Sequence, residues 1–302
     1  MIRTANAPVS YGVFELSRPE LVPLPDGEAL AAWVAEAGYE GIDLGPLGLL
    51  GDRDELPARL ARHGLALAGG WVDLPFAGDD AAFDAAWAGL DDALAVFAAA
   101  AELAPDRAPK PTIADSGSAE RKARPGGAPE LELAGDAWKR FAERVQRVAE
   151  RVRAAGLEPT FHHHASTYVE TPHEIDRLVA DTDIGLTFDT GHLLIGGGDP
   201  DADFDRWRDR INHIHLKDAD RRVLAAAAGS DDPMRDVWAN RVFVALGDGD
   251  LDVDGIVDRI VASGYDGWLV VEQDVILQDA ADVDRARADQ IANRERLRRW
   301  FA

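Results

Sequence analysis

Histidine and carboxylate residues are concentrated in a few short segments of this 302-residue chain. Six of the eight histidines lie in three of these segments, and a fourth segment adds two carboxylates. The segments are Phe161-His-His-His-Ala165, Phe188-Asp-Thr-Gly-His192, His213-Ile-His-Leu-Lys-Asp218 and Val271-Glu-Gln-Asp274. Imidazole and carboxylate groups bind divalent metals and transfer protons in enzymes. The clustering therefore indicates a site of metal-dependent or acid–base chemistry.

Each segment overlaps or follows an apolar run typical of a β-strand, and side chains alternate between the two faces of a strand. If Phe161 and Phe188 point outward, one side chain from each of four consecutive strands faces the same interior. These four are His162, Asp189, His215 and Glu272. Two imidazoles and two carboxylates suit Mn²⁺, Co²⁺, Fe²⁺ or Zn²⁺, whereas Mg²⁺ and Ca²⁺ prefer more oxygen ligands. We expect His163 to support or pack behind this set, and His213 to be hydrogen-bonded in the interior.

The remaining polar residues of these segments fit the proton transfers of a metal-assisted enolisation. A metal bound to a substrate carbonyl and its neighbouring hydroxyl acidifies the adjacent C–H bond. A base must then remove that proton, and an acid must protonate a leaving hydroxyl or the other carbon. We predict that His164, His192 and Lys217 serve in these roles. For Lys217, the alternative is an exposed lysine beside Asp218.

Short apolar runs alternate with amphipathic helical stretches along the whole chain, which is typical of βαβ units. The first expected strand falls within residues 2–10, and the others cover 41–45, 65–71, 111–115, 157–163, 184–189, 211–216 and 267–272. The expected helices cover 26–37, 54–63, 80–101, 136–155, a stretch from 172, 201–209, 253–263 and a stretch from 283 onward.

Eight strand–helix units predict one α/β domain over residues 1–302, a single (β/α)8 TIM barrel with loop insertions at 116–135 and 219–240. The chemistry-bearing segments then fall at the carboxyl ends of strands, where barrel enzymes build their active sites. A doubly wound sheet is the alternative. It is disfavoured because no G-x-G-x-x-G follows the first strand and no G-x-x-x-x-G-K-[ST] occurs.

Charge and cysteine content exclude other classes of function. Lys and Arg number 32 against 55 Asp and Glu, so the net charge is −23, which disfavours a phosphate-binding surface and hence nucleic-acid partners. The absence of cysteine excludes thiolate nucleophiles and Cys-ligated metals. We expect neither a signal peptide at the N-terminus nor a membrane span. A cytoplasmic protein without a membrane partner is therefore predicted.

Motifs along most of the chain resemble those of the xylose-isomerase-like (β/α)8 superfamily of sugar isomerases, epimerases and lyases. They include Asn6-Ala-Pro-Val-Ser10, Gly38-Tyr-Glu-Gly-Ile-Asp-Leu-Gly-Pro46, Gly69-Gly-Trp71, Val169-Glu-Thr171, Gly196-Gly-Gly-Asp-Pro200, Leu246-Gly-Asp-Gly249 and the four segments above. Within the superfamily, the chain is most similar to the myo-inosose dehydratases of inositol catabolism.

The resemblance implies a divalent metal at Asp189, His215 and Glu272, with Mn²⁺ or Co²⁺ expected first and Zn²⁺, Fe²⁺ or Mg²⁺ as alternatives. Many members have a glutamate where this chain has His162, so His162 and His164 are both candidates for the fourth ligand. A glutamate common in the second strand is replaced here by Asp43.

The resemblance and the site chemistry predict a metal-dependent lyase that removes water from a keto-inositol or related keto-sugar. The alternative is a sugar or sugar-phosphate isomerase or epimerase that uses the same enediolate. A DNA-repair endonuclease is disfavoured by the charge, and a non-catalytic sugar-binding barrel would lack turnover. Barrels of this type commonly pair, so a homodimer is a further expectation. We expect the small polyhydroxy substrate to contact Asn6, Asp43, Trp71 and Asp218, with Phe14 and Trp238 as further pocket candidates.

Overall fold

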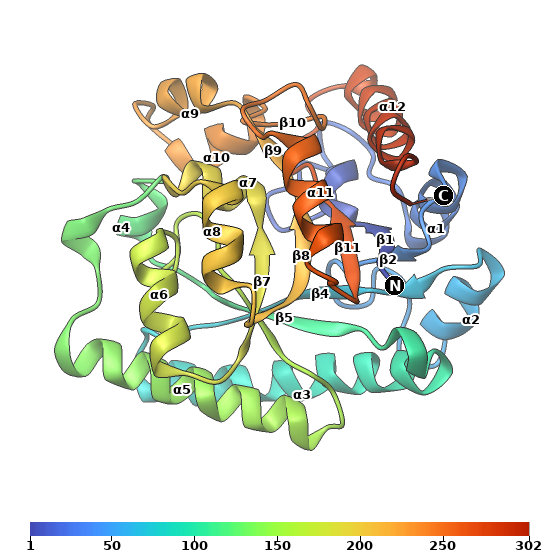
Figure 1. The fold of residues 1–302 in the computed structure, drawn as a ribbon. Helices are drawn as coiled ribbons and strands as arrows, with labels where there is room; N and C mark the ends of the chain where they lie inside the picture. Colours follow the sequence, from blue (N-terminus) through green and yellow to red (C-terminus); the bar gives the residue numbers. More distant parts are fainter. Residues whose placement is uncertain (302) are drawn as a thin grey trace.

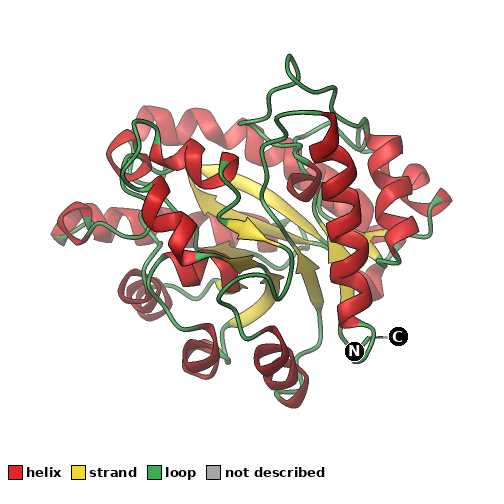
Figure 2. Cartoon of the chain, turned by 90° about the horizontal axis from the view of Figure 1, so that it is seen from above, coloured by secondary structure: helices red, strands yellow, loops and turns green. Residues whose placement is uncertain are grey.

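Parallel strands form the centre of the molecule and helices surround them, as seen from above in Figure 2. The structure is a computed structural model that describes residues 1–301. The strands of the central sheet are β1 (Arg3–Asn6), β2 (Gly41–Ile42), β3 (Ala66–Leu67), β4 (Gly69–Leu74), β5 (Lys110–Asp115), β6 (Thr160–His162), β7 (Gly185–Asp189), β8 (Ile211–Leu216) and β11 (Trp268–Val271).

The order of the strands closes the sheet into a barrel. It runs β3-β2-β1-β11-β8-β7-β6-β5-β4, and its two ends, β3 and β4, are separated in the chain by Ala68 alone. β3 pairs with β2 and β4 pairs with β5, so the expected third strand is present as two consecutive segments. The predicted (β/α)8 TIM barrel is thereby confirmed.

Gly70 lies near the point where the chain passes from β3, which pairs with β2, to β4, which pairs with β5. Its φ is +157°, and a Cβ atom there would lie 2.6 Å from Cβ of Leu44. A Cβ on Gly69 would approach Nε2 of His213 to 3.1 Å. These close approaches explain why two glycines stand in the middle of a barrel strand.

The outer helices are close to the expected ranges. They are α1 (Gly27–Ala37), α2 (Leu56–Arg62), α3 (Asp80–Leu103), α5 (Gly135–Ala154), α6 (Pro172–Asp181), α8 (Pro200–Trp207), α11 (Val253–Ala262) and α12 (Ala280–Leu297). Capping residues determine where several of these helices begin. Asp26 and Asp79 accept backbone hydrogen bonds from the first turns of α1 and α3, and Thr171 forms a capping box with Glu174 at the start of α6.

Aromatic residues between the barrel and the helices confirm the predicted alternation of faces. Phe161 of β6 packs against Phe76 and Phe141, with ring centroids 6.1 and 6.4 Å away. Phe188 of β7 packs against Phe204 at 5.5 Å. With these rings turned toward the helices, the neighbouring side chains on β6 and β7 face the barrel interior.

The segments between the predicted elements contain structure that their composition did not reveal. Residues 116–135 include α4 (Ala119–Lys122) and a short 3₁₀ helix (Pro129–Leu131). The 219–240 insertion folds into α9 (Arg221–Ala227) and α10 (Pro233–Ala239), and β9 (Asp218–Ala219) pairs with β10 (Phe243–Val244). Together α9, α10 and this strand pair lie above the carboxyl ends of β7 and β8 (Figure 1).

A further helix, α7 (Thr190–Ile195), starts directly after β7 and was not predicted. Among residues 1–301, no helix is both long and apolar enough to cross a membrane.

Candidate active site

A cavity of about 490 Å³ opens at the carboxyl ends of the barrel strands. Its floor is polar and includes His162, His164, His215, Lys217, Glu272 and Asp274. Its wall is apolar and includes Val9, Val13, Phe14, Pro46, Trp71 and Trp238. Phe14, Trp71 and Trp238 thus lie where pocket aromatics were expected. A polar floor beneath apolar walls is typical of small-molecule sites in barrels.

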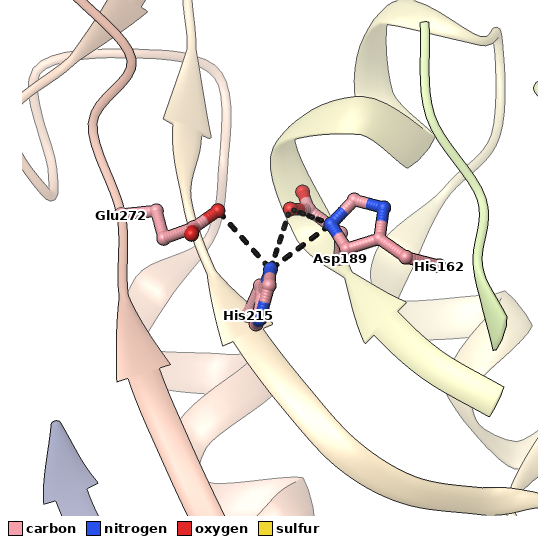
Figure 3. A group of neighbouring side chains, drawn as sticks. All are labelled: His162, Asp189, His215 and Glu272. Atoms are coloured by element: carbon pink, nitrogen blue, oxygen red, sulfur yellow. Dashed lines mark hydrogen bonds and ion pairs between the residues drawn. The ribbon is translucent and has the colours of Figure 1, made fainter. Parts of the chain in front are cut away.

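His162, Asp189, His215 and Glu272 converge at this floor, as the alternation of strand faces predicts (Figure 3). Nε2 of His162 lies 3.0 Å from Nδ1 of His215 and 3.4 Å from Oδ2 of Asp189. Nδ1 of His215 lies 3.5 Å from the same Asp189 oxygen and 3.1 Å from Oε2 of Glu272. One donor atom from each residue lies within 4.8 Å of the others, and all four side chains are buried.

Strand register brings these four residues together. Asp189 is the last residue of β7 and is paired with His215 of β8, while His162 ends β6 opposite Thr187. Val270 of β11 is paired with His215, which places Glu272 just beyond the strand end on the same side. Parallel strands in near register therefore convert four distant sequence positions into one cluster.

Coulomb interactions within the cluster oppose the effect of burial. Burial lowers the pKa of His215, but Glu272 and Asp189 outweigh it and raise that pKa to about 10. Burial raises the pKa of Glu272 and of Asp189, yet nearby cationic groups hold both well below their usual range. Nε2 of His215 faces Oδ2 of Asp43 at 3.7 Å, so Asp43 can orient the imidazole with Nδ1 toward the cluster.

Lys217 is buried at the centre of the carboxylates, which excludes the alternative of an exposed lysine. Its Nζ atom lies 2.9 Å from Oε2 of Glu272, 3.2 Å from Oδ2 of Asp189 and 2.9 Å from Oδ1 of Asp274. Burial lowers the pKa of Lys217, but the three carboxylates raise it above its usual value. The side chain therefore carries a positive charge in this structure.

The Asp-Thr-Gly segment after β7 makes room for this lysine. Oγ1 of Thr190 donates to the Lys217 carbonyl at 2.7 Å and accepts from the Lys217 N–H at 2.9 Å. A Cβ atom on Gly191 would lie only 2.5 Å from Cγ of Lys217. Glycine at this position permits the close approach of α7 to the lysine stem.

His164 and His192 lie beside this network. Their ring centroids are 3.8 Å apart, and Nε2 of His192 lies 3.0 Å from Nζ of Lys217. Burial holds the pKa of both histidines well below its usual value, and Lys217 lowers that of His192 further. His164 lines the cavity, whereas His192 is buried behind it. The structure thus brings His164, His192 and Lys217 together in one chain of contacts.

Asn6 and Asp218 lie outside the cavity, although both were predicted to contact substrate. The amide of Asn6 donates to the Val271 carbonyl and to Gln290 of α12, so the side chain ties the strand end to the last helix. The carboxylate of Asp218 accepts backbone N–H groups from 219, 247, 249 and 251 and holds that loop together. Neither is therefore a candidate for direct substrate contact. Asp43 and Trp71 do line the cavity.

His163 directly follows β6 and His213 lies on β8, and both side chains are buried. Nε2 of His163 accepts the backbone N–H of Asp189 at 3.2 Å, which agrees with a supporting role. His213 was expected to be hydrogen-bonded, but neither ring nitrogen has a hydrogen-bond partner among the described residues. Its ring instead packs 5.1 Å from that of His215 and against Gly69.

Asp274 is a polar residue of the site to which the sequence pattern assigned no role. It follows Glu272 by two positions beyond the end of β11, and both residues line the cavity. Its carboxylate contacts Lys217 and lies 3.6 Å from Nε2 of His192. By contrast, the cavity lining within residues 1–301 includes no residue from the 116–135 insertion.

The four-residue cluster fits a divalent metal on its chemistry. Two imidazole nitrogens and two carboxylate oxygens face one another in Figure 3 and lie within 4.8 Å of one another in a buried site. Oδ2 of Asp189 is fully buried and lies 3.2 Å from the Lys217 ammonium, 3.4 Å from Nε2 of His162 and 3.5 Å from Nδ1 of His215. The oxygen already faces cationic and nitrogen groups, and a set of two imidazoles and two carboxylates is one that a divalent metal binds. His164 belongs to a different group, with His192 and Asp274.

The fold and this cluster define a class: parallel barrels with a His and carboxylate centre at the carboxyl ends of their strands. The chain belongs to the xylose isomerase-like TIM barrel family, whose model matches residues 31–292. It is 31% identical over 246 residues to the inosose dehydratase of Geobacillus kaustophilus, covering 79% of this chain and 77% of that protein.

Other relatives match over shorter segments. The inosose dehydratase of Lacticaseibacillus casei is 40% identical over 146 residues, which cover 45% of this chain and 47% of that protein. The rhizopine catabolism protein MocC of Rhizobium meliloti is 41% identical over 142 residues, covering 46% and 44%. In these matches the chain spans about half the length of its relatives.

Solved structures share the fold at low sequence identity. D-psicose 3-epimerase from Clostridium cellulolyticum, solved with D-tagatose, superposes with a TM-score of 0.68 at 16% identity and covers 98% of each chain. The IolI protein with a bound zinc atom superposes with a TM-score of 0.67 at 11% identity, covering 97% of this chain and 95% of that one.

Proposed function

We propose that this protein is a metal-dependent inosose dehydratase. The observation that carries the proposal is the buried cluster of His162, Asp189, His215 and Glu272 beside Lys217, in a chain similar over most of its length to an inosose dehydratase. Dehydration next to a carbonyl needs an electrophile for the oxygen, a base for the C–H proton and an acid for the leaving hydroxyl. The cavity floor offers a group for each.

His162, Asp189, His215 and Glu272 would hold the metal, and Mn²⁺ or Co²⁺ suits this mixed set of nitrogen and oxygen donors. When bound, the metal would polarise the substrate carbonyl and stabilise the negative charge that develops on its oxygen. Asp43 would keep Nδ1 of His215 turned toward the cluster, and His163 would hold the backbone of Asp189 in place.

His164 is the group we assign to proton removal. It is the histidine of the second cluster that lines the cavity, and its low pKa leaves the imidazole neutral and able to accept a proton. The proton leaves the carbon next to the carbonyl, the C–H electrons form the new double bond, and the hydroxyl on the following carbon departs.

Lys217 is the acid that would protonate the departing hydroxyl, which then leaves as water. Its ammonium carries the needed proton and lines the same cavity. The ring of His192 packs against that of His164, and its Nε2 lies 3.0 Å from Nζ of Lys217. Water in the cavity would take the proton from His164 and return one to Lys217 after each turnover. This path restores both groups for the next turnover, and atoms and charges balance.

The charge of the cavity favours an uncharged substrate. Five carboxylates line it, those of Glu15, Asp43, Asp73, Glu272 and Asp274. Lys217 is the one lysine or arginine among the described lining residues, and three carboxylates already surround its ammonium. A phosphorylated sugar would enter without a counter-ion, whereas a neutral keto-inositol would not be repelled.

Incubation of the purified protein with 2-keto-myo-inositol and Mn²⁺ tests the proposal. We expect the absorbance of a conjugated diketone to appear, and to be absent when the metal is removed by chelation. Solvent deuterium incorporated into the recovered substrate without water loss would instead indicate an epimerase or isomerase. No conversion of any keto-polyol with any of the divalent metals would contradict the proposal.

A further inference from the structure

Trp238 of α10 connects the 219–240 insertion to the polar floor of the cavity. It is buried, and its indole N–H donates to Oδ2 of Asp274 at 3.2 Å. Its ring stacks over His164, with centroids 6.0 Å apart and planes inclined by 22°. Trp238 therefore contacts both His164, the proposed base, and Asp274, the carboxylate paired with Lys217.

The Asp274 carboxylate is shared between Trp238 and Lys217. Oδ2 accepts from the indole at 3.2 Å and from Nζ of Lys217 at 3.1 Å, while Oδ1 lies 2.9 Å from the same Nζ. The ammonium also rests 4.9 Å from the ring centroid of Phe243, which lies on β10 and packs against Trp238. The position of Lys217 thus depends in part on Trp238 of the insertion and on Phe243 of the strand that follows it.

The insertion is anchored at several points beside Trp238. The carbonyl of Ala239 accepts from Gln278 at 2.9 Å, and Arg241 pairs with Asp282 at 2.8 Å. The β9–β10 pair closes the segment directly after Lys217. Because α10 is held on both sides, the indole has a fixed place over the floor, as a positioning group requires.

We infer that Trp238 is a positioning residue for the reaction: its indole N–H orients Asp274, and Asp274 holds the Lys217 ammonium toward the substrate. The inference rests on the proposed dehydratase function. In this view the insertion is a structural part of the active site. Without its indole the Asp274 carboxylate can rotate, and Lys217 loses one of the three carboxylates that fix its direction. Replacing a hydrogen bond to a charged group typically changes a rate by roughly tenfold or more.

Trp238→Phe tests this role because it keeps an aromatic ring against His164 and removes the N–H. We expect kcat for 2-keto-myo-inositol with Mn²⁺ to fall roughly tenfold, while KM and bound metal stay unchanged. Trp207→Phe is a matched control: Trp207 is equally buried, and its N–H donates to Asp176 at 2.9 Å on the outside of the barrel. This control should retain wild-type kinetics.

A double-mutant cycle separates positioning from simple packing. If Trp238 acts through Asp274, Trp238→Phe should cause no further fall in kcat in an Asp274→Asn background. Equal effects in both backgrounds, or a change confined to KM, would overturn the inference.

Lysine labelling provides a readout without turnover. An amine-reactive reagent followed by mass spectrometry should label Lys217 faster in Trp238→Phe than in the wild type, with exposed Lys139 as the internal reference. Unchanged Lys217 labelling would contradict the inference, even if the wild type proved inactive as a dehydratase. Wild-type inactivity together with faster labelling would instead count against the proposed function alone.

Discussion

Nζ of Lys217 lies 2.9 Å from Oε2 of Glu272, the same oxygen that faces Nδ1 of His215 at 3.1 Å. The lysine and the proposed metal site therefore share a carboxylate. Glu272, Asp189 and Asp274 form a buried group of negative charge, and Lys217 contacts all three. Charge balance in the metal-free site depends on this ammonium together with His215, whose pKa Glu272 and Asp189 raise to about 10, because buried carboxylates without a counter-ion are costly.

Replacing Lys217 by methionine should destabilise the metal-free protein. Removing one partner of a buried ion pair typically costs about 3–5 kcal/mol, because the remaining charges stay buried. We expect a lower Tm in the metal-free state and a larger rise in Tm on adding Mn²⁺ than in the wild type. Lys139→Met changes an exposed lysine and should behave as the wild type. A Lys217→Met protein with unchanged metal-free Tm would refute the charge-balance argument.

Substitutions of His162 and His164 should affect metal binding and catalysis separately. His162 belongs to the metal cluster, whereas His164 lies with His192 and Asp274. His162→Ala and Asp189→Asn should each weaken Mn²⁺ binding at least about tenfold, because each removes a direct donor rather than a supporting group. His164→Ala should retain bound metal but lose kcat by roughly 10²-fold or more. Metal content after equilibrium dialysis, with circular dichroism to check folding, gives the result.

Loss of metal in His164→Ala and retention in His162→Ala would reverse this assignment. Asp73→Asn is the control for a carboxylate that lines the cavity outside the cluster. Its oxygens accept from Trp71 and Ser116. Bound metal should be unaffected by that change.

Phosphorylated sugars should neither react nor compete well with 2-keto-myo-inositol. Five carboxylates line the cavity. Its described lining residues include no lysine or arginine other than Lys217, whose ammonium is already paired with carboxylates. We expect inhibition constants for ketose phosphates to exceed those of the unphosphorylated sugars by about tenfold or more, with the difference shrinking as salt screens the repulsion. Tighter binding of the phosphates would show that another cationic group enters the site.

The stability of the protein should depend on the titration of Glu170, which is not part of the proposed ligand cluster. Burial raises its pKa from 4.5 to about 7, and Oε1 accepts the Gly126 N–H at 2.7 Å beneath the 116–135 segment. The folded state therefore binds more protons than the unfolded state between pH 4.5 and 7. The stability contributed by this group is full at pH 4.5 and is lost as the pH rises through 7.

Glu170→Gln removes this titration and keeps an acceptor for Gly126. The free energy of unfolding of the wild type, measured relative to this variant, should fall by about 1–3 kcal/mol between pH 4.5 and pH 7.5. Denaturant melts at the two pH values provide the measurement. A constant difference would show that Glu170 does not change its proton occupancy on folding.

Local patterns in the sequence were enough to predict the barrel and the four-residue cluster. Strand alternation alone placed His162, Asp189, His215 and Glu272 on one face, because the side-chain period of a strand is two and parallel strands end together. The predicted helix starts near 26 and 172 agree with α1 and α6, which the structure caps with Asp26 and Thr171. These features depend on near neighbours in the chain, so they are readable without a structure.

Contacts between distant segments were decided only in the tertiary structure. Asn6 resembled a substrate ligand, yet its amide bonds to Gln290 from the other end of the chain. Asp218 resembled a pocket residue and instead holds a loop from 29 to 33 residues away. Trp238 is part of a polar insertion, and only folding brings its indole to Asp274. The sequence by itself determined which strand faces carry the chemistry, because alternation is local. Folding decided which polar groups share a partner, because loop packing and charge compensation depend on every segment at once.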